Sequence, residues 1–201
     1  PNGDLPVTSR FDRAAIGAFL YGLLCYAAFF AVFLYAIGFI AGIGTPTSLD
    51  GVPQRPLGVA LAINLALLAV FALQHSGMAR PAFKRWWTRV VPVAVERSTY
   101  VLFSSIALAV MFVAWQPMGG VLWRLEGVAR TLVLVAYGGG WLLLLYTTFL
   151  IDHFDLFGLR QVWLRLRGRR YEAPRFRTPS VYRLVRHPLY VAWLVIFWCA
   201  P

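Results

Sequence analysis

The sequence predicts an all-α fold, a polytopic integral membrane helical bundle formed by a single domain over residues 1–201. Of the 201 residues, 60% are hydrophobic and only 13% are charged, whereas soluble domains average about 45–50% apolar and about 25% charged residues. The mean hydropathy is +0.67. The apolar residues also gather in runs that approach the roughly 20 residues a helix needs to cross the hydrocarbon core.

Five such runs predict five spans, at residues 14–42, 57–73, 99–115, 128–151 and 189–201. The first exceeds the apolar core of a signal peptide, which is about 7–15 residues long. The chain begins at Pro1 rather than Met, and its last run is still apolar at Pro201. We therefore expect the natural chain to continue beyond both ends, so that the fifth span is truncated here.

The basic residues predict the orientation. A net charge of +11 in a soluble protein would suggest nucleic acid, but here the arginines lie between apolar runs, so we expect no nucleic-acid partner. Lys and Arg mark cytoplasmic loops, which places the N-terminus inside and gives the basic loops anionic lipid headgroups as partners. The residues that set this pattern precede the third span (Arg80, Lys84, Arg85, Arg89, Arg97) and the fifth (Arg160, Arg165, Arg167, Arg169, Arg170, Arg175, Arg177, Arg183, Arg186).

Other segments carry weaker expectations. Residues 156–170 combine apolar and basic positions in a pattern that suits a helix lying on the inner leaflet, although a plain basic loop remains open. Asn64, Ser104 and Ser105 lie inside spans, where we expect hydrogen bonds between helices. The glycines at 138–140 favour a close helix approach or a kink.

Three histidines are predicted to meet at the cytoplasmic interface. His75 closes the second span, His153 closes the fourth between Asp152 and Asp155, and His187 opens the fifth. A single histidine at a helix end is usually an anchor or a cap. Three at one depth, two of them beside carboxylates or arginine, favour a functional site. No metal is expected, because Cys25 and Cys199 lie in apolar runs without ligand spacing.

The start of the fifth span has its own chemistry. Pro188 suits the first turn of a helix, and the free N–H groups that follow favour an anion. Arg186 can add a bidentate bond to a carboxylate or phosphate, and Tyr190 lies near the same opening. Upstream, a short helix carrying Tyr182 and Arg183 is expected after residues 178–180. A proline helix start within a basic flank is the simpler alternative.

The residues also resemble a known group of membrane enzymes. Residues 182–190, YRLVRHPLY, resemble the cofactor motif of the isoprenylcysteine carboxyl methyltransferase superfamily, whose members use S-adenosylmethionine. Three further segments resemble one branch of it, the bacterial methanethiol S-methyltransferases: QHSGMARP at 74–81, ERSTY at 96–100 and DHFDLFGL at 152–159. In the superfamily a further helix and an acidic C-terminal segment close the cofactor pocket, and neither lies within residues 1–201.

The resemblance implies methylation of a small thiol, methanethiol, to dimethyl sulfide. It implies that S-adenosylmethionine is the cofactor and that Arg186, His187, Pro188 and Tyr190 hold it. Tyr182, Arg183 and Trp193 are further cofactor-binding candidates, since an aromatic ring attracts a sulfonium.

The thiol must lose its proton, because the thiolate is the nucleophile. His75 and His153 are the candidate bases, and Asp152 or Asp155 would orient the imidazole. A cap or an ion pair with loop arginines is the alternative for the aspartates.

Three other functions stay open. Histidines on neighbouring spans can ligate a b-type haem, and membrane reductases resemble the same superfamily. A non-enzymatic membrane subunit would use the arginines for topology alone, and a family linked to nitric-oxide metabolism shares the His-Ser segment.

Overall fold

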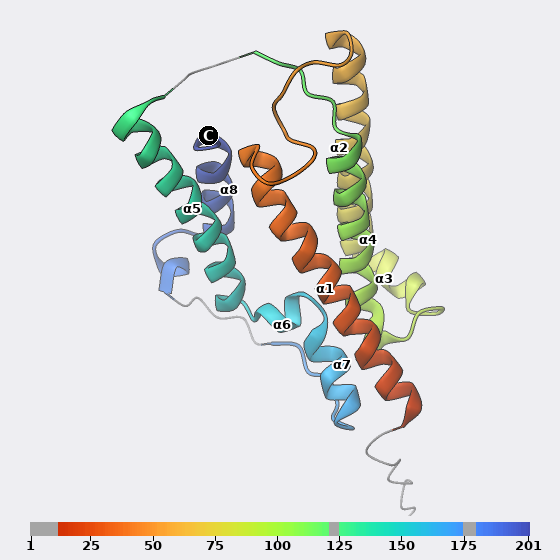
Figure 1. The fold of residues 1–201 in the computed structure, drawn as a ribbon. Helices are drawn as coiled ribbons and strands as arrows, with labels where there is room; N and C mark the ends of the chain where they lie inside the picture. Colours follow the sequence, from red (N-terminus) through yellow and green to blue (C-terminus); the bar gives the residue numbers. More distant parts are fainter. Residues whose placement is uncertain (1–11, 121–124, 175–179) are drawn as a thin grey trace, which may run out of the picture.

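The computed structural model describes residues 12–120, 125–174 and 180–201, and within these ranges every regular element is a helix (Figure 1). In chain order they are α1 (Arg13–Ala41), α2 (Leu57–Ala79), α3 (Pro81–Trp87), α4 (Val93–Ala114), α5 (Gly127–Leu150), α6 (His153–Leu156), α7 (Leu159–Leu166), the 3₁₀ helix η1 (Ser180–Arg183) and α8 (Pro188–Trp198).

Four of these helices, α1, α2, α4 and α5, are long and apolar enough to cross a membrane, and α8 is a shorter apolar helix. The predicted all-α polytopic bundle is therefore confirmed. The helices of the second and third predicted spans are longer than their apolar runs, because α2 continues to Ala79 and α4 already begins at Val93. Hydropathy falls at polar residues such as Gln74 and Arg97, but the backbone stays helical until Pro81 and resumes after Pro92. Proline removes a donor and fixes φ, which makes it the stronger boundary.

Local chemistry sets the ends of the helices. Asp12 caps α1 by accepting a bond from the Ala14 N–H at 3.3 Å, as short acidic side chains do at helix starts. Gly42 ends α1 with a left-handed φ of 66°, a conformation glycine adopts without steric cost. Pro188 occupies the first turn of α8, as the sequence predicted.

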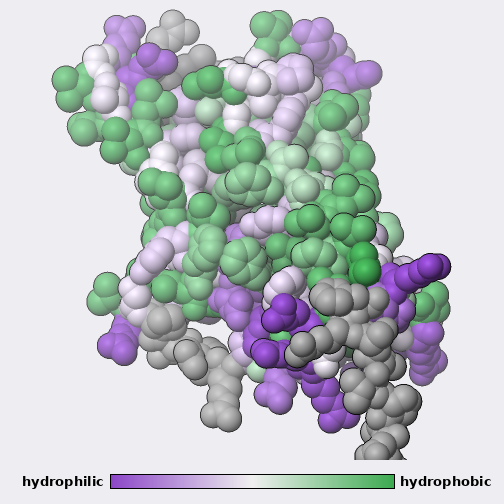
Figure 2. All heavy atoms as spheres, turned by 60° about the horizontal axis from the view of Figure 1, so that its bottom comes forward, coloured by the Kyte–Doolittle hydropathy of each residue, from purple (hydrophilic) through white to green (hydrophobic). Residues whose placement is uncertain are grey.

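The bundle is arranged around α1. In Figure 1, α1 lies between the α2–α4 pair and the α5–α8 pair, and α7 packs across its lower half. At that lower end α2 and α5 finish while α1, α4 and α8 begin. Figure 2 shows a hydrophobic band with hydrophilic side chains gathered most densely below it. We call this lower end the polar end of the bundle.

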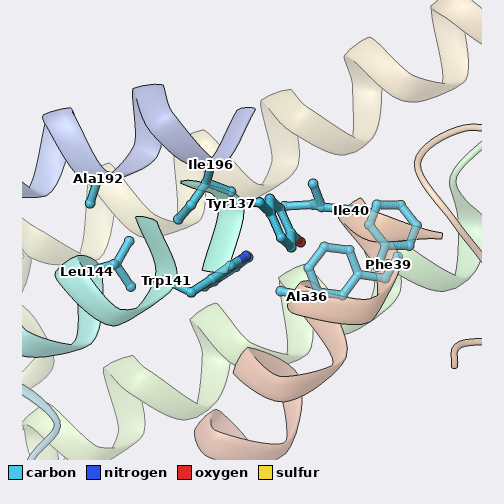
Figure 3. Packing of buried hydrophobic residues seen from close by; sticks show 9 residues of the cluster. Ala36, Phe39, Ile40, Tyr137, Trp141, Leu144, Ala192 and Ile196 are labelled. Atoms are coloured by element: carbon cyan, nitrogen blue, oxygen red, sulfur yellow. The ribbon is translucent and has the colours of Figure 1, made fainter. Parts of the chain in front are cut away.

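The buried core joins α1 to α5 and α8 (Figure 3). Gly140 allows α5 to approach α8 closely, because an added Cβ there would lie 2.9 Å from Ile196 Cγ1. The expected close approach at the triple glycine is thus present at Gly140, whereas Gly138 and Gly139 have open space. The core residues are Ala36, Phe39, Ile40, Phe112, Tyr137, Trp141, Leu144, Ala192 and Ile196.

Residues 153–166 form two short helices rather than the single helix expected over 156–170. The break is at Gly158, whose φ is +87°, and an added Cβ there would lie 2.6 Å from the Ser98 backbone nitrogen. On the other side of α7, a Cβ at Gly22 would lie 2.6 Å from Val162. Val162 and Leu166 are buried while Trp163 stays partly exposed, so α7 is amphipathic and rests on α1 and α4.

The intramembrane polar groups follow the expectation in part. Asn64 exchanges two hydrogen bonds with the Gln116 backbone, at 2.8 and 2.9 Å, and so ties α2 to the end of α4. Ser104 contacts α2 through His75. Ser105 was expected to bond between helices, but it donates to the Val101 carbonyl in its own helix, the usual alternative for a helical serine.

Candidate functional site

All three histidines lie at the polar end of the bundle. They were expected to meet, but the structure places them in three separate environments. His75 lies in the last turns of α2, His153 begins α6 and His187 immediately precedes α8. Within the described ranges, their rings contact different sets of neighbours. The three histidines therefore belong to three separate local sites.

His75 is the open one. Its residue is exposed, its ring stacks on Phe71 with centroids 5.2 Å apart, and its polar partners come from α4. The Tyr100 hydroxyl lies 3.0 Å from Nδ1 and 3.1 Å from Nε2, and the Ser104 Oγ lies 3.2 Å from Nδ1. Hydroxyls on the neighbouring helix thus hold the imidazole while one side of the ring stays accessible.

Arg97 extends this cluster toward α6. Its guanidinium lies 4.9 Å from the Tyr100 ring centroid, within cation–π range, and its Nε donates to the Leu156 carbonyl at 2.7 Å. Sequence reasoning missed Tyr100, Ser104 and Arg97 as partners of His75. The one available signal was the resemblance of residues 96–100 to an enzyme segment.

His153 is enclosed. It is only 3% exposed and stacks on Phe149 at 4.2 Å. The Thr148 hydroxyl donates to the Leu145 carbonyl at 2.6 Å, so its oxygen accepts from His153 Nδ1 at 2.7 Å. Nε2 is then the bare nitrogen, and it accepts from the Tyr26 hydroxyl at 2.8 Å. Both nitrogens of the neutral imidazole are thus hydrogen-bonded. Burial lowers the pKa of His153.

Asp152 and Asp155 were expected to orient a histidine, but the structure gives them other partners. Arg160 Nη1 lies 3.2 Å from Asp152 and 3.4 Å from Asp155, and Tyr171 donates to Asp155 at 3.2 Å. Asp152 also caps α6 by accepting from the Asp155 N–H. Because the His153 nitrogens are already taken, the base–orienter pair is not formed, and the cap and ion-pair alternative describes these contacts. Burial raises the pKa of Asp155, against the opposing effects of Tyr171 and Arg160.

The start of α8 presents the predicted anion-binding groups together. Arg186, His187 and Tyr190 are all exposed, and the His187 and Tyr190 rings lie 5.3 Å apart. Among the described residues no side chain caps the first N–H groups of α8. The Tyr190 and Val191 N–H groups donate to the His187 carbonyl, so the Leu189 N–H is the free backbone donor of the first turn. A cation, an imidazole and a free N–H at one helix start suit a carboxylate. Pro188 itself is buried and fixes the turn.

The remaining candidates flank this opening. Tyr182 and Arg183 lie in η1, which confirms the short helix expected there, and a 3.3 Å bond from Tyr146 to Ser180 ties η1 to α5. Residues 178 and 179, expected at the start of that helix, lie outside the described residues.

Trp193 is partly exposed and meets the Trp141 ring edge-on at 5.8 Å. The buried Trp141 Nε1 has no partner within the described ranges. Trp193 and Trp141 therefore form an aromatic pair between α8 and α5, and the Trp141 Nε1–H donor of this pair has no described partner.

The described part of the chain contains no group of three His, Cys, Asp or Glu side chains that could hold a metal ion. The site chemistry available there is that of imidazoles, hydroxyls, guanidiniums and aromatic rings.

Fold and site together define a class, a polytopic helical membrane protein with titratable side chains at one end of its spans. No family model matches the chain, and no solved structure matches it. This chain is 49% identical over 183 residues to the Methanethiol S-methyltransferase of Crocosphaera subtropica. The aligned region covers 90% of this chain and 72% of that protein. The chain belongs to the methanethiol S-methyltransferase family.

Other relatives agree. Methanethiol S-methyltransferase 2 of Bradyrhizobium diazoefficiens is 47% identical over 95% of this chain and 73% of its own length. The Methanethiol S-methyltransferase of Mycobacterium tuberculosis is 46% identical over 90% of this chain and 75% of its own length. A more distant relative, Nurim of Rattus norvegicus, is 34% identical over 76% of this chain and 62% of that protein. These relatives do not favour the reductase, haem or non-enzymatic alternatives.

Proposed function

We propose that this protein methylates methanethiol with S-adenosylmethionine and so forms dimethyl sulfide. The observation that carries the proposal is the 49% identity, over 90% of the chain, to a protein named for this activity. The polar end of the bundle supports it, because a base candidate and an anion-binding helix start are exposed there.

The groups around the start of α8 fit the cofactor. When bound, S-adenosylmethionine supplies a methyl group on a sulfonium, so a C–S bond forms to the thiol sulfur as the sulfonium C–S bond breaks. Arg186 and the free N–H of Leu189 would bind the carboxylate of that cofactor. His187 and Tyr190 would complete this wall of the site.

Further aromatic and basic side chains would position the rest of the cofactor. Trp193 would stabilise the positive charge through its ring face. Tyr182 and Arg183 would flank it from η1.

His75 is the better candidate for the base. A base has to reach the thiol proton, and His75 is exposed whereas His153 is only 3% exposed. Tyr100 and Ser104 would hold the imidazole in place while it accepts the proton. His153 would then position α6, and Asp152 and Asp155 would shape the turn through Arg160.

The setting would bring the two substrates in from different phases. The arginine distribution supports a cytoplasmic location for the polar end of the bundle, with the protein in a bacterial inner membrane and its basic loops against anionic headgroups. A small apolar thiol partitions into lipid, and a polar cofactor arrives from the cytosol. A base at the end of a span would meet both.

The test uses the full-length protein purified in detergent. It is incubated with methanethiol and S-adenosylmethionine carrying a deuterated methyl group, and the headspace is analysed by mass spectrometry. We expect dimethyl sulfide with one deuterated methyl group, and binding of the cofactor by calorimetry. Absence of both the product and cofactor binding would overturn the proposal. The Methanethiol S-methyltransferase of Crocosphaera subtropica, assayed alongside, is the positive control.

A further inference from the structure

A pocket of about 420 Å³ opens at the polar end of the bundle, beside the first turn of α4. Its wall is built by α3, α4 and the segment from α6 through the residues after α7. Six charged side chains line it: Lys84, Glu96, Arg97, Asp155, Arg165 and Arg169. Four cations face two carboxylates, so the pocket carries an excess of two positive charges.

The two carboxylates are already matched. Glu96 lies 3.9 Å from Lys84, and Asp155 pairs with Arg160. The side chains of Arg165 and Arg169 make no hydrogen bond or ion pair with any residue that the structure describes. Two guanidiniums thus line one concave surface without a counter-charge, and guanidinium suits phosphate or carboxylate because it binds them bidentately.

The backbone adds donors to the same wall. Val93 and Ala94, at the start of α4, line the pocket, and within the described ranges no side chain caps that helix start. Uncapped N–H groups at the start of a long helix favour an anion. Gln161 also lines the pocket; it is 8% exposed, and its Oε1 has no partner among the described residues. The pocket wall therefore contains a buried acceptor that a donor group on a ligand can satisfy.

The pocket lies where an apolar span meets a basic end. Val93 is 69% exposed on its edge, and nearby Val90 and Trp86 are 76% and 54% exposed. Trp is enriched at the level of lipid headgroups. An apolar rim beside a cationic pocket matches a molecule with a charged head and apolar chains, and a small soluble anion would make no use of that rim.

We infer that this pocket binds the phosphate of an anionic phospholipid, with Arg165 and Arg169 as its ligands and the exposed rim at Val93 against the acyl chains. A headgroup hydroxyl, as in phosphatidylglycerol, supplies the donor that Gln161 lacks. This site is separate from the α8 start, and it does not depend on the proposed methyl transfer.

The test is lipid retention by the full-length protein in native mass spectrometry. Delipidated protein in detergent is titrated with phosphatidylglycerol or phosphatidylcholine. The test variant combines Arg165→Gln with Arg169→Gln. The matched control combines Arg167→Gln with Arg170→Gln, which removes the same charge from the same segment but outside the pocket. Thermal denaturation checks that both variants are folded.

We expect the unaltered protein and the control to prefer phosphatidylglycerol. The test variant should bind it about tenfold or more weakly, because charge-assisted hydrogen bonds to the phosphate are lost. An equal loss in both variants would show a diffuse basic surface and overturn the inference. Displacement of the lipid by inorganic phosphate or glycerol phosphate would reassign the pocket to a soluble anion. Displacement by S-adenosylmethionine would reassign it to the cofactor.

Discussion

The Tyr26 hydroxyl donates to Nε2 of His153 across 2.8 Å. This bond joins the middle of α1 to the first residue of α6, and Thr148 fixes the opposite nitrogen. A buried imidazole therefore connects two helices that are far apart in the chain. It explains why the sequence places a histidine at this position without requiring a catalytic role.

Tyr26→Phe should lower the stability of the protein. The substitution leaves Nε2 of a buried imidazole without a donor, which costs about 1–3 kcal/mol. Thermal denaturation in detergent measures the change, and Tyr190→Phe serves as the control because Tyr190 is 68% exposed. Equal melting temperatures for the two variants would contradict the role assigned to the bond.

Stability should fall as the pH is lowered below about 6.5, the ordinary pKa of histidine. Burial lowers the pKa of folded His153, so in this window the unfolded chain binds a proton that the folded protein does not, and acid favours unfolding. Melting temperatures between pH 8 and pH 5 measure the slope. His153→Gln should show a shallower slope than the unaltered protein, and an unchanged slope would argue against this account.

His75→Gln should reduce the rate of methyl transfer by about 10²–10⁴-fold, the usual effect of removing a general base. The deficit should shrink as the pH rises, because the thiol then ionises without help. The pH profile of kcat/KM for the thiol is the measurement. His153→Gln is the comparison, and it should keep the unaltered profile while losing stability. The assignment fails if the two variants exchange these behaviours.

Arg186→Gln should raise the KM for S-adenosylmethionine by about tenfold or more, since a charge-assisted bond to the carboxylate is lost. The kcat should change less, because that carboxylate is remote from the transferred methyl group. Arg170→Gln removes the same charge from an exposed position away from α8 and should leave the KM unchanged. A similar KM for all three proteins would remove Arg186 from the site.

Gly158→Ala should destabilise the protein more than Gly168→Ala. Both glycines have positive φ, +87° and +63°, so each alanine carries a left-handed cost of about 1–2 kcal/mol. Only at position 158 does the new Cβ also meet backbone, 2.6 Å from the Ser98 nitrogen, whereas Gly168 has open space. Denaturation of the two variants side by side isolates the packing cost, and equal losses would show that α4 can move away.

The fold class could be predicted from the sequence because hydropathy reports directly on the solvent around a helix. The helix bounds could not be predicted in the same way. The apolar runs end at polar residues such as Gln74 and Arg97, whereas the helices end and begin near Pro81 and Pro92. The break at Gly158 was also missed, because it depends on how closely α4 approaches the turn.

The sequence predicted at which end of the bundle the candidate site residues lie, but it did not predict most of their side-chain contacts. Spacing placed His75, His153 and His187 at one end of the bundle. It could not show that Tyr100 would reach His75 from another helix, or that Tyr26 would occupy His153. Those pairings depend on the packing of α1 and α4, which local sequence does not encode.

The packing of α7 against Gly22 of α1 fixes the height of α7 relative to the membrane spans. Spans tilt, and bilayers thin or thicken, when their hydrophobic lengths differ, and a helix that merely floats at the surface follows the lipid. Here Val162 of α7 packs against Gly22 of α1, where any larger side chain would clash with it. This contact fixes the position of α7 along α1. The height of the aspartates and of His153 is therefore set by the protein's own scaffold, and should stay constant in bilayers of different thickness.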